Sequence, residues 1–294
     1  MSAIKTAVTK VRDLDRQRLQ TFEKKKAAIE IAANKIAAGK NSEIVIVDFG
    51  PVVGFVFDPR QQKLVDKVDA LKHRATSHDQ PLALITRPEY LSKLVNHKDI
   101  PVWLDKLIQD MSLPQAVHYR LSADGKELPE TVWSKGKNGT KMIQVALFGE
   151  DASPELSYLL TLLWKKGIHF VAATSANVHG VSETEIYRRG KTIADVQGFF
   201  YLDAAPLGHE IAGSFPGIEI DSEVEGFVLF REGHLHELHI RQVFAGYSLR
   251  RDDKAKASTY PYSADLLERE LTTAIALLPH RIRLQVLFAL AASE

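Results

Sequence analysis

Between residues 44 and 240 the sequence alternates short apolar runs with amphipathic segments of helical period, and this order is the strongest constraint on the fold. The runs are rich in β-branched residues, as in Ile44-Val45-Ile46-Val47, and are bounded by breakers such as Gly50-Pro51. Both properties are typical of buried strands. Helical spacing of leucine and valine follows in residues 60–73. Strands mixed with helices in this way predict an α/β (α+β) fold with a twisted, mixed, open sheet flanked by helices.

The apolar runs predict strands along most of this region, at residues 44–47, 52–57, 81–86, 116–121, 142–148, 169–173, 199–202, 218–220, 226–231 and 235–240. Helices are predicted at residues 60–73, 88–94 and around 103–108. A further helix begins at Ser153-Pro154-Glu155, because serine can cap, proline suits the first helical position and glutamate opposes the helix dipole. We expect Gly167 to end that helix.

The chain is expected to have three parts. Residues 1–26 form a basic helical extension, residues 27–245 the central domain, and residues 246–294 a C-terminal helical segment. Few helix breakers occur before Gly39, so residues 3–38 are predicted as helical. The buried face of that helix is expected in its second half, at Ala28, Ile29, Ile31, Ala32, Ile36 and Ala37.

Composition and charge exclude several classes of function. The chain contains no cysteine, which rules out disulfides, thiolate zinc sites, iron–sulfur clusters and cysteine nucleophiles. Residues 1–40 carry ten basic and four acidic side chains, although the whole chain has a net charge of +1. This basic block is either a solvated helix face or an arm that contacts RNA. No apolar stretch has the length of a signal peptide or membrane span, so we expect a cytoplasmic protein that does not contact the membrane.

Two cations stand just past the helix of residues 60–71. In an extended segment Lys72 and Arg74 would lie on the same side and could bind one anion together. The alternative is that they favour a helix C-terminus through the helix dipole. The spacing does not decide between these two interpretations.

A second candidate site follows the strand of residues 169–173, in Thr174-Ser175-Ala176-Asn177 and the nearby Gly180. Sheets of this class place ligands at the carboxyl ends of their strands. Hydroxyl and amide groups suit phosphate, ribose or carboxylate. The alternative is a polar turn without a ligand.

These motifs resemble, in order and over residues 27–243, the YrdC-like or threonylcarbamoyl-AMP synthase family. Leu71-Lys72-His73-Arg74 followed by Pro81-Leu82 resembles the family's Lys-x-Arg motif. Thr174-Ser175-Ala176-Asn177 with Gly180 resembles its Ser/Thr-Ser-Ala-Asn motif, and this match is the most specific one. Ser214 and Phe230-Arg231-Glu232-Gly233 resemble its closing segment.

The resemblance implies an activity in which ATP, threonine and bicarbonate give threonylcarbamoyl-AMP and pyrophosphate, for the modification of an adenosine in tRNA. Lys72 and Arg74 would then bind the triphosphate, with Mg²⁺ neutralising further charge and no metal held by the protein itself. Thr174, Ser175 and Asn177 would orient the nucleotide, and Ser214 would add a phosphate contact. Double-stranded RNA binding is also credited to some members. The oligomeric state does not follow from the resemblance.

The sequence departs from the family pattern mainly on the side of the amino-acid substrate. Val47-Asp48-Phe49-Gly50 stands where the family has Tyr-Pro-Thr, and Ile85 where it often has histidine. Ala146 occupies a position that is often arginine, and Phe215 or Pro216 replaces threonine. The acceptor could therefore be a molecule other than threonine. The alternative is a diverged, non-catalytic domain that binds a nucleotide or double-stranded RNA. An apolar wall from Phe49, Ile85 and Ala146 would favour that alternative, and a second cationic or hydroxyl-bearing set facing Lys72 and Arg74 would favour the enzyme.

Overall fold

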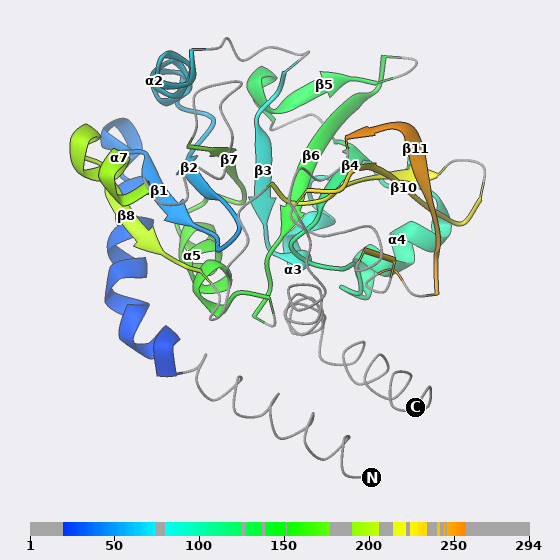
Figure 1. The fold of residues 1–294 in the computed structure, drawn as a ribbon, viewed down its shortest axis with the longest axis horizontal. Coiled ribbons are helices and arrows are strands. Elements are labelled where there is room, and N and C mark those ends of the chain that lie inside the picture. The colour runs from blue at the N-terminus through cyan, green and yellow to red at the C-terminus, as the bar shows by residue number, and fades with distance from the viewer. Residues whose placement is uncertain are drawn as a thin grey trace.

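The computed structural model describes residues 20–73, 80–124, 128–136, 139–150, 152–176, 190–205, 214–221, 224–233, 240–241, 244 and 246–256. Its centre is an 11-stranded mixed sheet in the order β11-β10-β9-β4-β6-β3-β7-β2-β1-β8, with β5 paired to β6 (Figure 1). The strands are β1 (Val45–Asp48), β2 (Val53–Phe57), β3 (Ala83–Thr86), β4 (His118–Ser122), β5 (Trp133–Lys135), β6 (Lys141–Leu147), β7 (Val171–Ser175), β8 (Phe200–Asp203), β9 (Gly217–Asp221), β10 (Gly226–Arg231) and β11 (Ser248–Lys256).

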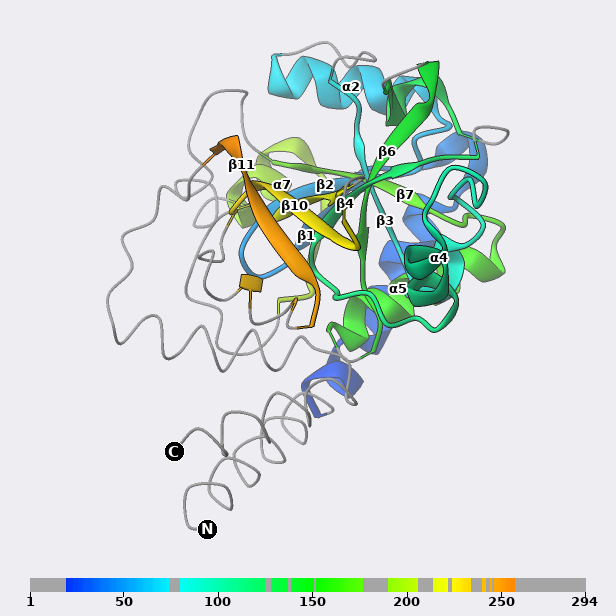
Figure 2. The ribbon, with the colours of Figure 1, turned by 90° about the vertical axis from the view of Figure 1, so that its right-hand side faces the viewer.

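Helices cover both faces of the sheet. They are a first helix described over residues 20–36, α2 (Gln62–Lys72), α3 (Pro88–Leu91), α4 (Val102–Gln109), α5 (Pro154–Lys165) and α7 (Gly190–Gln197), with short 3₁₀ turns η1 (Gly39–Asn41) and η2 (Glu130–Val132). Figure 2 looks onto the β11 edge of the sheet and shows α2 beyond one end of the central strands. The sequence prediction of a mixed sheet flanked by helices is confirmed.

Two hydrophobic cores lie on opposite faces of the sheet, as the alternation of side chains along a strand requires. In β1, Ile46 packs in the core that contains α2 and α4, whereas Val45 and Val47 pack in the core that contains α5 and the first helix. Within the first helix the predicted buried face is correct at Ile29, Ala32 and Ile36, but Ile31 is exposed. Ile31 lies on the side of the helix that faces away from the sheet.

The predicted start of α5 is confirmed in detail. The Ser153 hydroxyl accepts a hydrogen bond from the Leu156 backbone N–H at 3.2 Å, with Pro154 at the first helical position. The helix ends before Gly167, which has a left-handed φ of 79°. In the part of the chain that the structure describes, no helix is both long enough and apolar enough to cross a membrane.

Two predictions about segment boundaries need correction. The first helix runs without a break through residues 26 and 27, and Phe22 packs edge-to-face on Tyr158 of α5, so the proposed boundary at residue 26 falls inside one packed element. Residues 246–294 were expected to form a helical segment, but residues 248–256 form β11, parallel to β10, and residues 257–294 lie outside the described residues. Ion pairs from Arg250 to Asp221 and from Arg251 to Glu232 hold this polar strand. The predicted strand at 235–240 lies outside the described residues except Ile240, which is helical.

The basic N-terminal block is partly neutralised by neighbouring carboxylates. Lys25 pairs with Asp203 of β8 at 3.1 Å, and Lys26 pairs with Glu23 at 2.7 Å. Lys35 pairs with Glu43 at 2.8 Å. These pairs agree with a solvated helix face over residues 20–40. The rest of the predicted RNA-contacting arm lies outside the described residues, so RNA contact stays a prediction.

Candidate functional site

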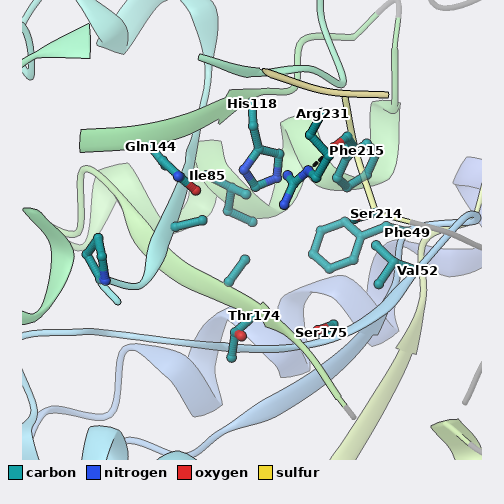
Figure 3. Close-up of a pocket in the computed structure, with 14 residues that line it drawn as sticks. Phe49, Val52, Ile85, His118, Gln144, Thr174, Ser175, Ser214, Phe215 and Arg231 are labelled. Carbon is teal, nitrogen blue, oxygen red and sulfur yellow. Dashed lines mark hydrogen bonds between the residues drawn. The ribbon is translucent and has the colours of Figure 1, made fainter. Parts of the chain in front are cut away.

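A cavity of about 220 Å³ opens on the face of the sheet that carries α5 (Figure 3). Its walls come from the central strands β2, β3, β4, β6 and β7, the β1–β2 turn and the segment around β9 and β10. The lining residues that carry the argument are Phe49, Ile85, His118, Gln144, Thr174, Ser175, Ser214, Phe215 and Arg231.

Ser175, which lines this cavity, contacts Lys72, which is not among the lining residues. Lys72 is the last residue of α2, and its side chain is buried, with 3% of its surface exposed. Its ammonium donates to the Ser175 backbone carbonyl and lies 3.4 Å from the Ser175 hydroxyl. His73 then takes a left-handed conformation, with φ of 50°, and ends the helix. The fold therefore brings together two of the predicted site residues, which are 103 positions apart in the sequence.

The hydroxyls of the second predicted motif lie within a strand and not in a turn. β7 was expected to end at Ala173, but it continues through Ser175, because β2 pairs alongside it with Gly54 opposite Ser175. A side chain on Gly54 would place its Cβ 3.0 Å from the Phe49 ring and 3.1 Å from the Thr174 carbonyl oxygen. The chain therefore needs glycine at position 54 to keep the two strands and Phe49 in place.

The other predicted residues divide into two groups. Thr174, Ser175 and Ser214 line the cavity. Arg74 and Asn177 lie outside the described residues, so their predicted roles remain predictions. Lys72 is the last residue of α2 and His73 is left-handed, so the backbone is not extended at these two residues.

The opposite wall is polar as well, and sequence reasoning did not assign it. His118, Gln144 and Arg231 lie on one side of the cavity, facing Thr174 and Ser175 on the other (Figure 3). Gln144 was visible as a polar residue inside an otherwise apolar strand, Met142–Phe148. His118 carried no such signal, because only the pairing of β4 with β6 and β9 brings it to this face.

An apolar wall is also present, in part as predicted. Phe49 and Ile85 line the cavity together with Phe215, whereas Ala146 is fully buried and does not line it. The Phe49 ring packs on Phe148 and Phe215 with centroid distances of 5.9 and 6.1 Å. The two features that were expected to separate an enzyme from a binding domain therefore occur in the same cavity.

Asp48 fixes the turn that carries Phe49. Its carboxylate accepts hydrogen bonds from the Gly50 backbone N–H and from the Tyr201 hydroxyl, both at 2.9 Å. Burial raises the pKa of Asp48, and these two hydrogen bonds oppose the rise. Asp48 thus has a structural role in holding the β1–β2 turn at the rim of the cavity.

Among the described lining residues, the cavity carries one charged side chain, the guanidinium of Arg231. Burial, aided by the charge of Arg231, lowers the pKa of His118 to about 3, so its imidazole is neutral at ordinary pH. Among the described residues that line the cavity none is acidic. Nor do the described residues contain a group of three or more histidines or carboxylates that could hold a metal ion.

Replacing His118 with phenylalanine should make the fold less sensitive to acid. The unfolded chain binds a proton at position 118 near pH 6.5, and the native chain does so only near pH 3. The wild type therefore loses stability as the pH falls through this window. At pH 4.5, two units below the unfolded pKa, this loss is about 3 kcal/mol, and the variant does not suffer it. Urea unfolding of both proteins at pH 7.5 and 4.5 measures the difference, and equal losses would contradict the prediction.

The comparisons with known proteins agree on the fold. No protein-family profile and no curated protein matches the sequence. The structure of P. abyssi Sua5 complexed with L-threonine matches with a TM-score of 0.54 at 20% identity, over 80% of this chain and 64% of that chain. The fold is YrdC-like.

Two HypF structures match this YrdC-like fold less extensively. Full-length HypF in the phosphate- and nucleotide-bound form has a TM-score of 0.51 at 16% identity, over 70% of this chain and 29% of that chain. T. kodakarensis HypF has a TM-score of 0.50 at 18% identity, over 70% of this chain and 24% of that chain. The chain thus spans less than two thirds of the length of each of these proteins. The family resemblance read from the sequence is confirmed at the level of the fold.

Proposed function

We propose that this YrdC-like domain binds ATP and forms an acyl-adenylate of the threonylcarbamoyl-AMP type, for the modification of an adenosine in tRNA. The observation that carries the proposal is the buried Lys72 ammonium held against Ser175, a residue that lines a cavity with no acidic side chain among its described lining residues. Such a charge suits the phosphates of a nucleotide. The fold is shared with Sua5 solved with L-threonine and with HypF solved with phosphate and nucleotide, which supports the same assignment.

The proposed reaction needs positioning and charge stabilisation but no nucleophilic side chain. The amino group of the acceptor combines with bicarbonate to give a carbamate and water. A carbamate oxygen then bonds to the α-phosphorus of ATP, the bond from that phosphorus to the bridging oxygen breaks, and pyrophosphate leaves. The residues lower the barrier by holding the two reactants together and by stabilising the charge on the leaving group.

Each of the predicted site residues has its own part in this scheme. Lys72 neutralises the phosphates, and Ser175 and Ser214 donate hydrogen bonds to phosphate oxygens. Thr174 and Asn177 orient the nucleotide, with Arg74 as a second cation. Mg²⁺ enters with ATP, since this ion is commonly held by the substrate's phosphates and by water.

A second function is favoured by the apolar part of the cavity. Phe49 and Phe215 leave no hydroxyl where the family resemblance led us to expect one, and Ile85 stands where it led us to expect histidine. In this alternative the domain binds the nucleotide without activating an acceptor.

Pyrophosphate release separates the two functions. With ATP, bicarbonate and L-threonine, or another small amino acid as acceptor, the enzyme should release pyrophosphate and form the matching carbamoyl-adenylate, detected by mass spectrometry. Omission of either the acceptor or bicarbonate should abolish both signals. Intact ATP binding without acceptor-dependent release across the common amino acids would favour the binding domain.

A further inference from the structure

The cavity wall opposite Ser175 carries three hydrogen-bond donors from three different strands. These are the neutral imidazole of His118 in β4, the amide of Gln144 in β6 and the guanidinium of Arg231 in β10 (Figure 3). Each can donate to an oxygen, and none of them is an acid. A wall of this kind fits an anionic group such as a carboxylate.

The backbone around His118 is built to place this side chain. Ala116, two residues earlier, has a left-handed φ of 56°, a conformation that is strained for a non-glycine residue. The strand is fixed on both sides: Ala116 donates to the Leu147 carbonyl at 3.0 Å, and the His118 backbone N–H donates to the Pro216 carbonyl at 2.8 Å. The strained turn and its anchors therefore hold the imidazole at one point on the cavity wall.

The imidazole itself has an unsatisfied hydrogen-bonding atom. Its ring stacks on Phe215 with centroids 5.7 Å apart and an angle of 23° between the planes. The enclosed Nδ1 has no hydrogen-bond partner among the described residues. An enclosed N–H without a partner would cost more free energy than an enclosed nitrogen lone pair, and the positive charge of Arg231 disfavours a proton at Nδ1. We therefore assign the proton of the neutral ring to Nε2, its outer nitrogen. Nε2–H is then available as a donor to a molecule in the cavity.

We propose that His118 is a specificity-determining residue, which donates its Nε2–H to the carboxylate of a small monocarboxylic acceptor held also by Gln144 and Arg231. The apolar remainder of that molecule packs on Phe49, Ile85 and Phe215. This inference rests on the proposed function, because the acceptor is the molecule that ATP activates. It goes further because it names the side chain with which this protein binds the acceptor, at a site for which the family resemblance gave no residue.

The test compares three substitutions by calorimetry. H118F keeps the ring on Phe215 but removes the donor, H118Q keeps an uncharged N–H donor, and H97F changes an exposed histidine that bonds to Asp105 away from the cavity. The probes are L-threonine, L-valine and L-threoninamide, each titrated with and without a non-hydrolysable ATP analogue. The analogue is also titrated alone.

We expect H118F to weaken the binding of whichever carboxylate the wild type takes by about tenfold or more, the effect of one hydrogen bond to a charged acceptor. H118Q should recover most of this loss, H97F should resemble the wild type, and the amide should bind weakly to every variant. The affinity for the carboxylate should be the same at pH 6 and pH 8, because His118 is neutral at both values. If His118 gained its proton within this range, the affinity would change. Binding of the ATP analogue should be the same in all variants.

Two results would overturn the inference: unchanged carboxylate affinity in H118F, or a wild type that binds neither carboxylate with or without the analogue. Failure of the analogue to bind would instead contradict the proposed function, and the titrations without nucleotide would still decide the role of His118.

Discussion

Replacing Lys72 with methionine should lower the affinity for ATP by roughly a hundredfold, the largest functional effect that we expect of a single substitution. Methionine keeps the length of the apolar stem, so the change removes the ammonium and little else. Lys72 is 3% exposed. Its charge is therefore poorly screened by water, and a phosphate beside it gains more than from a surface lysine.

Calorimetry with the non-hydrolysable analogue measures this loss, and circular dichroism confirms that the variant is folded. K63M is the matched control, because Lys63 lies on the same helix with an exposed side chain and bonds only to the carbonyl of Lys40 among the described residues. Its affinity should equal that of the wild type. A folded K72M that binds the analogue as tightly as the wild type would show that Lys72 only anchors Ser175, with the nucleotide site elsewhere.

The juxtaposition of Lys72 and Ser175 could be predicted from the sequence only through the family resemblance. Local spacing allowed two interpretations of Lys72, as part of an anion site or as a cation that favours a helix C-terminus. In the structure Lys72 is the last residue of α2. What spacing could not give is the reach of a helix-terminal side chain to a strand 103 residues later. The strand and helix pattern of the middle of the chain was predictable because each element buries one apolar face.

The missed features all depend on partners that are distant in sequence. β7 extends to Ser175 because β2 pairs with it, although Thr174 and Ser175 are not apolar. β11 has no apolar period and is held by parallel pairing to β10 and by the ion pairs of Arg250 and Arg251. His118 and Arg231 are more than 100 residues apart, and each strand by itself gives no sign that they share a wall. A polar wall assembled from several strands is therefore beyond a local pattern.

Phe227→Ala should cost about 3–5 kcal/mol of unfolding free energy, the largest stability effect that we expect. Phe227 in β10 is 1% exposed. Its ring packs on Trp103 of α4, with centroids 5.2 Å apart, and on Phe244 and Tyr247 at 4.8 and 5.6 Å. Truncation would empty the centre of this aromatic cluster, which neighbouring rings held by the backbone cannot refill.

Urea unfolding followed by tryptophan fluorescence measures the loss, with Phe227→Leu as a milder variant in case the alanine variant does not fold. Val102→Ala is the control, since Val102 lies one residue from Trp103 and is 87% exposed, and its effect should stay within about 0.5 kcal/mol. A cost below about 1 kcal/mol for Phe227→Ala would show that β10 and α4 do not unfold together with the rest of the domain. Because β10 ends at Arg231, a folded Phe227→Leu protein should also bind carboxylates more weakly. Its affinity for the ATP analogue should stay unchanged, because that affinity depends on Lys72 and on Ser175 on the opposite wall of the cavity.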